Sequence, residues 1–429
     1  MPGIIKVDEI EQGPGGAGVK LKHALKDSSG QDIISETANT VTVATDKLNI
    51  GTTEVIDSSR QAKNITLADS VVPAHSYMFR NKIINGSMSV TQYSTTPVTG
   101  VTASGKPVVC DRWHTFGSGF GTYTLAQSTD APAGFATSLL IDNTATSGAG
   151  TSDHFGIQYK FEGQELQSFA KGNSAAQPMT VSWYSKTTKP GVYTVELDDR
   201  DNTRSISAQF TATTAWTRHS VTFPGDTTGA LDNDNLASLH LSWWLMAGPS
   251  FTSGTLQTAW DARTNANRVS STNINLSDNA ANSFYITGVQ LEMGNTATPF
   301  EHRPIGMELS LCQRYYQKSY EAGIVPGTDI SAHYRGIHFS NGVCDSSTNQ
   351  NLPFTVEISP VMRAQPTLYY YTLEGTLNRY NVFTAGAMNR SESSTSLSGI
   401  YRSDRKLSGY NAPGAGNLYG FLYVLNAEL

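Results

Sequence analysis

The chain has 429 residues, of which 38% are hydrophobic and 15% are charged, and its formal net charge is −6 at pH 7. One core rarely serves so long a chain, so two to four domains are expected, and the low charge with abundant Gly, Ser, Thr and Asn favours a β-rich exterior protein over a metabolic enzyme. The negative charge argues against binding to nucleic-acid phosphates or to anionic membranes.

Residues 1–78 are predicted to form a stalk or an attachment segment. Short alternating fragments, such as the one from Thr40 to Ser59, contain too few large apolar residues to enclose a core within one chain. Several identical chains could share one core, so we expect a homotrimer here or a segment that a partner orders. Plain disorder is the alternative interpretation.

Residues 79–303 carry strand candidates at regular spacing, separated by clusters of Gly, Pro, Asp or Asn. The candidates include PVVCDRWHTF, MTVSWYSKT, VYTVELDDR, LASLHLSWWLM and SFYITGVQLEM. No helical periodicity lies between them. This pattern predicts an all-β fold, with an antiparallel jelly-roll sandwich as its main domain.

Residues 304–317 are predicted to form a short linking helix. Pro304 suits a first helical turn, and apolar residues from Leu309 to Tyr316 follow at separations of three and four. A helix this short is marginal alone in water, so it must pack on the sandwich or on its copies in other chains.

Residues 318–429 return to strand patterns and predict a C-terminal β domain, completed by contacts in an oligomer. Its last strand, from Leu418 to Leu425, is apolar on both faces, which is typical of a strand buried on both sides. The domain is also rich in tyrosine, which suits a contact surface. The tyrosines are Tyr369, Tyr370, Tyr371, Tyr401, Tyr410, Tyr419 and Tyr423.

The three cysteines, Cys110, Cys312 and Cys344, are too few and too widely spaced for a disulfide framework or a zinc cluster. We expect them to be buried as small apolar side chains. No signal-peptide pattern opens the chain, and no apolar run approaches the roughly 20 residues that span a bilayer. The sequence therefore predicts folding in a reducing cytoplasm without membrane insertion.

Several phrases of the sequence occur in a recognisable order. They are RNKIINGSMSVTQY from Arg80 to Tyr93, CDRWHTF from Cys110 to Phe116, GVQLEMGNTATPFEHRPIGMELSLCQRYYQ from Gly288 to Gln317, and PVMRAQPTLYY from Pro360 to Tyr370. Together they resemble a family of tail-fibre-like bacteriophage virion proteins that is common in marine phages.

The resemblance implies a carbohydrate-binding-module-like jelly roll, then a helix and a variable C-terminal domain. It implies a structural virion protein, made in the host cytoplasm, that joins other virion proteins through its N-terminal segment and contacts a host surface glycan or receptor. One alternative is a decoration or head-fibre protein on the capsid. Another is a glycan depolymerase, although no residue in the chain announces catalysis.

Paired carboxylates are the one catalytic arrangement to weigh, because a glycosidase needs two acids about 5 to 10 Å apart. Glu196 and Asp198 would share one face of a strand at roughly 7 Å, and Glu292 is a third acid. The same spacing occurs on any solvated strand face. Alternatively, Asp198, Asp199 and Asp201 supply oxygen ligands for a structural calcium ion, the one cofactor weighed.

Glycan binding has better support in the pattern. Alternation places Trp244 beside His240 and Ser242 on one face of its strand, and Tyr184 among polar residues on another strand. Aromatic planes beside hydrogen-bonding groups, here with Glu196, are what a sugar ring binds. The alternative is that Trp244 packs under a loop or against another protomer.

The segment from Asp111 to His114 contains titrating groups beside an aromatic residue. We expect Trp113 to lie in the core and Asp111 and Arg112 to form a local ion pair of small energetic weight.

Overall fold

The computed structural model describes residues 79–102, 109–333, 335–341, 352–384, 390–393, 396–411 and 417–429. Before residue 79 it describes only the backbone of short strands. These are β1 (Ile10–Gln12), β2 (Val19–Leu21), β3 (Leu25–Lys26), β4 (Asp32–Thr37), β5 (Thr40–Val43), β6 (Leu48–Ile50) and β7 (Thr53–Ile56). The chain divides into two compact units, Met1–Ser76 and Tyr77–Leu429. The rest of the predicted stalk lies outside the described residues.

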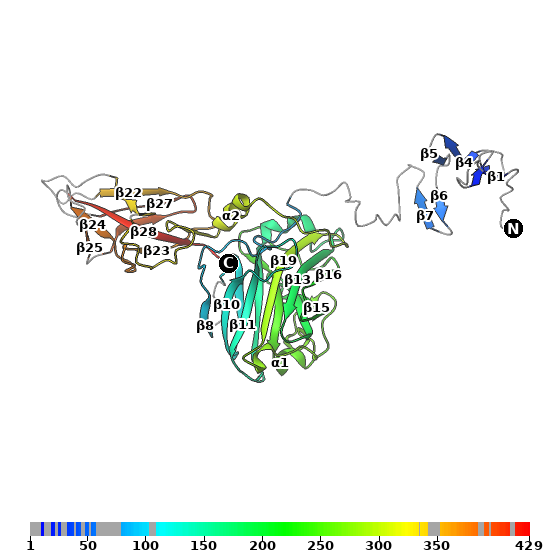
Figure 1. Cartoon of the computed structure of the whole chain (residues 1–429), viewed down its shortest axis with the longest axis horizontal. Coiled ribbons are helices and arrows are strands. Elements are labelled where there is room, and N and C mark those ends of the chain that lie inside the picture. The colour runs from blue at the N-terminus through cyan, green and yellow to red at the C-terminus, as the bar shows by residue number, and fades with distance from the viewer. Residues whose placement is uncertain are drawn as a thin grey trace. The chain divides into compact units, whose positions relative to one another are not determined.

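The predicted sandwich is confirmed, and its strands pair antiparallel in two six-stranded sheets (Figure 1). Sheet I has the order β16-β13-β19-β11-β10-β8 and contains β8 (Val98–Val101), β10 (Thr122–Ser128), β11 (Ser138–Ala145), β13 (Met179–Thr187), β16 (Thr217–Phe223) and β19 (Ser283–Met293). Sheet II has the order β18-β15-β14-β17-β12-β9 and contains β9 (Trp113–Ser118), β12 (His154–Glu162), β14 (Gly191–Asp199), β15 (Arg204–Ala212), β17 (Ala237–Ala247) and β18 (Asp261–Ala262).

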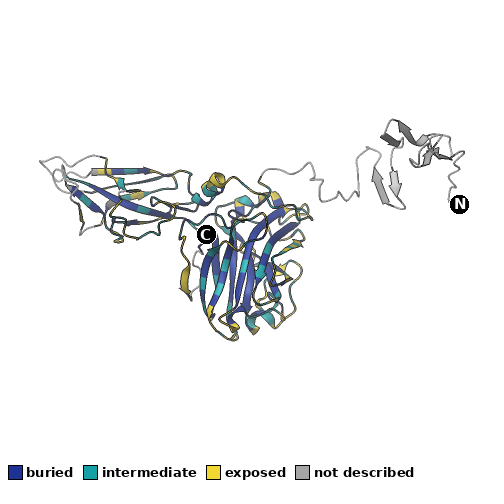
Figure 2. Ribbon diagram, viewed as in Figure 1, coloured by how far each residue is buried: buried dark blue, intermediate teal, exposed yellow. Residues whose placement is uncertain are grey.

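An aromatic core lies between the two sheets. Trp183 of sheet I and Trp243 of sheet II are fully buried with ring centroids 5.6 Å apart, and Trp113 lies 5.7 Å from Trp243. Their burial agrees with the alternation predicted for these strands. Figure 2 shows buried residues along the strands, whereas exposed ones gather in connections and on the helix α2 (Ile305–Gln313).

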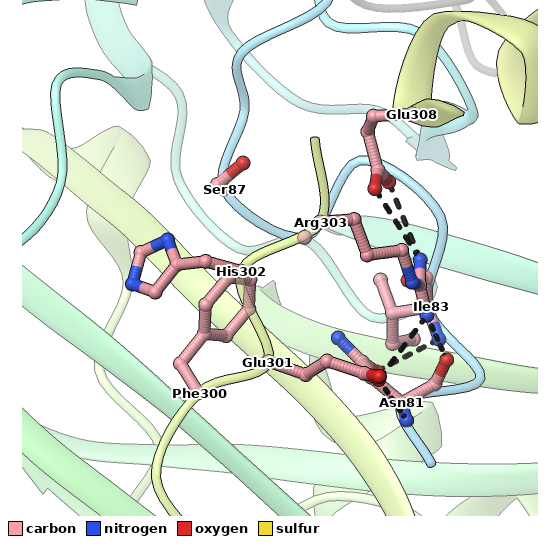
Figure 3. A pocket seen from close by; sticks show the side chains of 9 residues that line it. Asn81, Ile83, Ser87, Phe300, Glu301, His302, Arg303 and Glu308 are labelled. Carbon is pink, nitrogen blue, oxygen red and sulfur yellow. Dashed lines mark hydrogen bonds and ion pairs between the residues drawn. The ribbon is translucent and has the colours of Figure 1, made fainter. Parts of the chain in front are cut away.

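Residues from the phrase that begins at Arg80 and from the phrase that begins at Gly288 contact one another, as Figure 3 shows. The Glu301 carboxylate accepts the backbone N–H groups of Phe79 at 2.6 Å and Asn81 at 2.9 Å. Arg303, whose side chain is 6% exposed, donates to the Ile83 carbonyl at 3.0 Å. A Cβ atom at Gly86 would lie 2.1 Å from the Val289 carbonyl oxygen. These phrases therefore fasten the beginning of the domain to its last strand.

The helix is shorter than the predicted 304–317. It spans Ile305–Gln313, and Tyr316 instead begins β20 (Tyr316–Lys318), which pairs with β28 (Asn417–Asn426). The strand pairing of Tyr316 with β28 thus outweighs the helical periodicity of the sequence. Glu308 and Cys312 are the buried helix residues, and Glu308 accepts the backbone N–H of Asn85. This contact packs the helix on the sandwich, which is one of the two partners expected for it.

The C-terminal β domain is built around β28. Strand β28 pairs with β20, β21 (His338–Phe339), β23 (Thr367–Tyr371) and β24 (Asn381–Thr384), and β24 also pairs with β25 (Arg390–Glu392). A three-stranded sheet of β22 (Leu352–Glu357), β27 (Lys406–Asn411) and β26 (Ser398–Arg402) lies in the same domain. Phe421 and Leu422 of β28 are fully buried in two different apolar clusters, which confirms a strand buried on both faces.

Cys110 and Cys312 are buried and unbonded, as predicted, and Cys344 lies outside the described residues. Among the helices in the described ranges, none is long and apolar enough to cross a membrane.

A buried ion pair joins the C-terminal end to the sandwich. Arg112 bonds Glu428 and donates to the Lys160 carbonyl at 2.9 Å, and its guanidinium lies 3.4 Å from the ring centre of Tyr315. The prediction that Arg112 pairs with Asp111 is therefore wrong.

The two acids of this region have opposite pKa shifts. Burial opposes the ionisation of Glu428, but Arg112 and His114 lower its pKa to about 2. Burial raises the pKa of Asp111 to about 7, although that carboxylate accepts hydrogen bonds from Gln92. Asp111 and Arg112 lie in the turn before β9, where Arg112 has φ 74°, and each pKa follows the contacts that its acid makes across the fold.

We expect Glu428→Gln to lower the free energy of unfolding by about 3–5 kcal/mol, because Arg112 would remain buried without its counter-charge. Urea denaturation at pH 7 measures this loss. Asp404→Asn is the matched control: Asp404 pairs with Arg405 at 3.8 Å and its side chain is 43% exposed. The control should change stability by less than about 0.5 kcal/mol. Equal small losses in both variants would contradict the assignment.

Candidate functional site

The structure divides the predicted glycan-binding residues between two surfaces. Trp244, His240, Ser242 and Glu196 lie on the outer face of sheet II, opposite the core-facing Trp243 and Val195. Tyr184 lies on the outer face of sheet I. Because the core separates the two faces, one sugar chain cannot bind both sets in the way the sequence suggested.

The outer face of sheet II is covered where Trp244 lies. Trp244 is 1% exposed, and its indole N–H donates to Glu196 Oε2 at 3.0 Å. The Arg268 guanidinium lies 4.9 Å from the Trp244 ring centre, and the Phe251 ring packs at 5.3 Å. The segment that follows β17, including the short helix α1 (Pro249–Thr252), therefore covers this ring. Trp244 points to the outer face of its sheet as predicted, but it is not open to a ligand, and the alternative interpretation, packing under a loop, describes its position.

The three candidate acids are enclosed by partners. Glu196 accepts two bonds from Arg268 at 2.7 and 2.9 Å, and Asp198 accepts two from Arg263 at 2.7 and 2.9 Å. Burial raises the pKa of Glu196, and Arg268 opposes this shift. Glu292 belongs to sheet I, is 3% exposed and accepts the Thr298 backbone N–H at 2.9 Å. None of these carboxylates has the open approach that a glycosidase acid needs.

The three aspartates weighed for calcium do not converge. Alternation along β14 sends Asp198 and Asp199 to opposite faces, and Asp199 pairs with the buried Lys171. Asp201 lies beyond the strand and accepts the backbone N–H of Asp232 at 2.9 Å. Arginine side chains therefore balance the charge of Asp198, and Lys171 balances that of Asp199. Within the described ranges, no three His, Cys, Asp or Glu side chains form a metal-binding group.

The outer face of sheet I carries a different set of aromatic rings, which we call the aromatic platform. Its rings are half-buried or exposed and come from β13 and β19 of sheet I and from three connections, which follow β10, β15 and β19. The members are Phe135, Tyr184, Trp216, Tyr285, Phe300 and His302. Figure 1 shows β16, β13 and β19 side by side, and Figure 3 shows Phe300 and His302 turned away from the Arg303 ion pairs.

One end of the platform centres on Phe135. Its ring centroid lies 5.4 Å from Tyr184, 5.1 Å from Phe300 and 5.2 Å from His302. Gly288, in the left-handed region at φ 62°, leaves room for this packing, because a Cβ there would lie 2.6 Å from Phe135. The connection after β10 and the connection after β19 thus meet over sheet I.

The other end of the platform combines rings with charge. The Trp216 indole N–H donates to Asp130 at 2.9 Å, and Asp130 pairs with Lys186. The Lys186 ammonium lies 4.9 Å from the Tyr285 ring centre and 5.8 Å from that of Trp216. Hydrogen bonds from Lys186 and Trp216 lower the pKa of Asp130. These contacts hold the rings in fixed orientations.

The platform offers apolar ring faces together with unused hydrogen-bonding groups. In the described part of the chain, no hydrogen-bond partner is found for the phenol hydroxyls of Tyr184 and Tyr285. Of these rings, only Tyr184 was predicted from the sequence to bind a glycan. Tyr285 carried a usable signal, since it alternates with buried residues in β19. Phe135 and Trp216 had none, because only the fold brings their segments beside Tyr184.

Comparisons with known proteins give weak likeness. No protein family matches the chain, and no curated protein does. The enzymatically active domain of bacteriophage CBA120 tailspike protein 4 is 11% identical over 50% of this chain and 21% of that domain, with a TM-score of 0.28.

Two carbohydrate-binding modules show similar values. The CBM22-1 xylan-binding domain of Paenibacillus barcinonensis Xyn10C is 12% identical over 48% of this chain and 98% of that domain, with a TM-score of 0.25. TmCBM61, solved with β-1,4-galactotriose, is 8% identical over 50% and 99%, with a TM-score of 0.26. Scores this low carry no argument about function.

The predicted site residue His240 has a measurable consequence for stability. Burial, and then the charges of Lys160 and Arg200, lower its pKa to about 3. An unfolded chain binds this proton near pH 6.5, whereas the fold does not until about pH 3. The stability that neutral His240 contributes is therefore present above pH 6.5 and is lost as the pH falls through this window.

We expect His240→Gln to lose less stability than the native chain between pH 8 and pH 5. Thermal melting followed by circular dichroism at both pH values measures the difference. The effects of the other titrating groups cancel in the comparison, because the native chain and the variant both contain those groups. Parallel decreases in melting temperature would show that His240 takes up its proton equally well in the folded protein.

Proposed function

We propose that the chain is a tail-fibre-like structural protein of a phage virion, and that its aromatic platform binds glycan on the host surface. The observation that carries this proposal is the platform itself: packed, half-buried or exposed rings, with phenol hydroxyls on Tyr184 and Tyr285 for which the described residues supply no hydrogen-bond partner. A sugar ring presents C–H groups to an aromatic face and hydroxyls to polar neighbours, which this surface supplies.

The wider role rests on the resemblance of the sequence to tail-fibre-like virion proteins. In this proposal the N-terminal segment attaches the chain to other virion proteins, and the assembled fibre is a homotrimer outside the particle. In the single chain, α2 buries Glu308 and Cys312 against its own sandwich and leaves Ile305 62% exposed, and the homotrimer stays a prediction. Because Glu196 and Asp198 are buried, glycan binding is favoured over glycan cleavage.

The C-terminal domain offers a second contact surface for the same role. Of its tyrosines, Tyr401 is 62% exposed, Tyr410 is 41% exposed and Tyr369 is 40% exposed. Tyr370 and Tyr419 are buried and belong to the core. Exposed tyrosines give large contact area at low entropic cost, so a receptor could engage this domain after the platform binds glycan.

We expect Tyr184→Ala and Trp216→Ala each to weaken glycan binding at least about tenfold, because truncating an aromatic anchor removes its contact area. A glycan array followed by titration calorimetry on the strongest saccharide measures the loss. Leu236→Ala is the control, since Leu236 is 60% exposed and lies outside the platform. Unchanged binding by both platform variants, or no saccharide bound by the native chain, would reject the proposal.

A further inference from the structure

Arg218 lies beside Tyr184 of the aromatic platform. Arg218 of β16 is the Cα partner of Tyr184 of β13. Directly opposite residues project from the same face of a sheet with Cβ atoms about 4.5–5.5 Å apart. The neighbouring pair, Trp183 and His219, occupies the core side of the same strands. Arg218 therefore shares the outer face with Tyr184, and it is exposed.

The Arg218 side chain is anchored without being neutralised. Its Nη2 donates to the Thr298 carbonyl at 2.6 Å, from the connection that crosses sheet I. In the described ranges no carboxylate lies within ion-pair distance of this guanidinium. Lys186 differs, because Asp130 already balances its charge. Arg218 is thus an oriented cation beside the platform, and no carboxylate in the described part of the chain balances its charge.

We propose that the platform selects an acidic glycan, in which the sugar ring packs on Tyr184 and a carboxylate or sulfate group binds Arg218. This inference rests on the proposed function and specifies its ligand class. A planar guanidinium matches two anionic oxygens at once, and one hydrogen bond to Thr298 already restricts its rotation. A neutral sugar would leave these donors without a charged partner.

The position of β16 gives such a ligand access. It is the outermost strand of sheet I, paired only with β13 in the described sheets. Ser220 follows Arg218 on the same face and is also exposed. A glycan crossing from Tyr184 toward this edge would meet a hydroxyl beside the cation. The ring face, the cation and the hydroxyl together define the direction in which the chain of sugars would lie.

The test is a glycan array of uronic-acid, sialylated and sulfated oligosaccharides, each beside its carboxyl-reduced or desulfated counterpart. The native chain should prefer the acidic member of a pair. Arg218→Gln should weaken binding of the acidic member roughly ten- to hundredfold and leave its neutral counterpart unchanged. Raising the salt concentration should also weaken binding of the acidic member to the native chain, because salt screens the attraction between its charge and Arg218.

Arg405→Gln is the matched control, because Arg405 is 74% exposed on the C-terminal domain and its loss changes net charge equally. This variant should bind like the native chain. Equal binding of acidic and neutral counterparts would overturn the inference and leave glycan binding intact. Equal weakening by both arginine variants would also overturn it, because it would show a nonspecific charge effect. Binding to no saccharide would instead reject the proposed function.

Discussion

A two-layer sandwich buries one face of each sheet, and the two faces left outside decide what the domain can bind. Alternation sends every second side chain of a strand outward, so the core and the outer faces are set by the same residues in the same order. In this chain the two outer faces differ in how far other segments cover them. That of sheet II is covered by the chain's own segments, whereas that of sheet I keeps aromatic rings within reach of solvent.

Ion pairs hold the covering segment against the outer face of sheet II. Buried Glu196 and Asp198 are costly unless paired, and Arg268 and Arg263 satisfy them from the segment above. Immediately before β9 of the same sheet, Arg112 forms an ion pair with Glu428, which follows β28 of the C-terminal domain. The acids that could have formed a reactive cleft thus serve to close the surface. The C-terminal domain is fastened to the sandwich by the same kind of contact.

Sequence patterns predicted this fold well where the information is local. The strands, the core positions of Trp183 and Trp243, and the two-faced burial of β28 all follow from alternation and composition. The end of the helix did not, because Tyr316 gains strand partners that lie far along the chain.

The candidate site was harder to predict because it depends on sheet membership. Alternation placed Tyr184 and Trp244 outward on their strands, but no local signal says that the strands belong to opposite sheets. Coverage is equally nonlocal. Trp244 is covered by Phe251 of α1 and by Arg268. The rings that join Tyr184 in the platform come from β19 and from the three connections that contain Phe135, Trp216 and Phe300.

Side-chain footprinting by hydroxyl radicals, with and without a saccharide that the chain binds, tests the central claim most directly. If sheet I presents the binding face, oxidation of Tyr184, Trp216 and Tyr285 should fall when saccharide is added, while Trp244 stays unreactive throughout. Protection confined to the outer face of sheet II, with the sheet I rings equally reactive in both samples, would contradict the account.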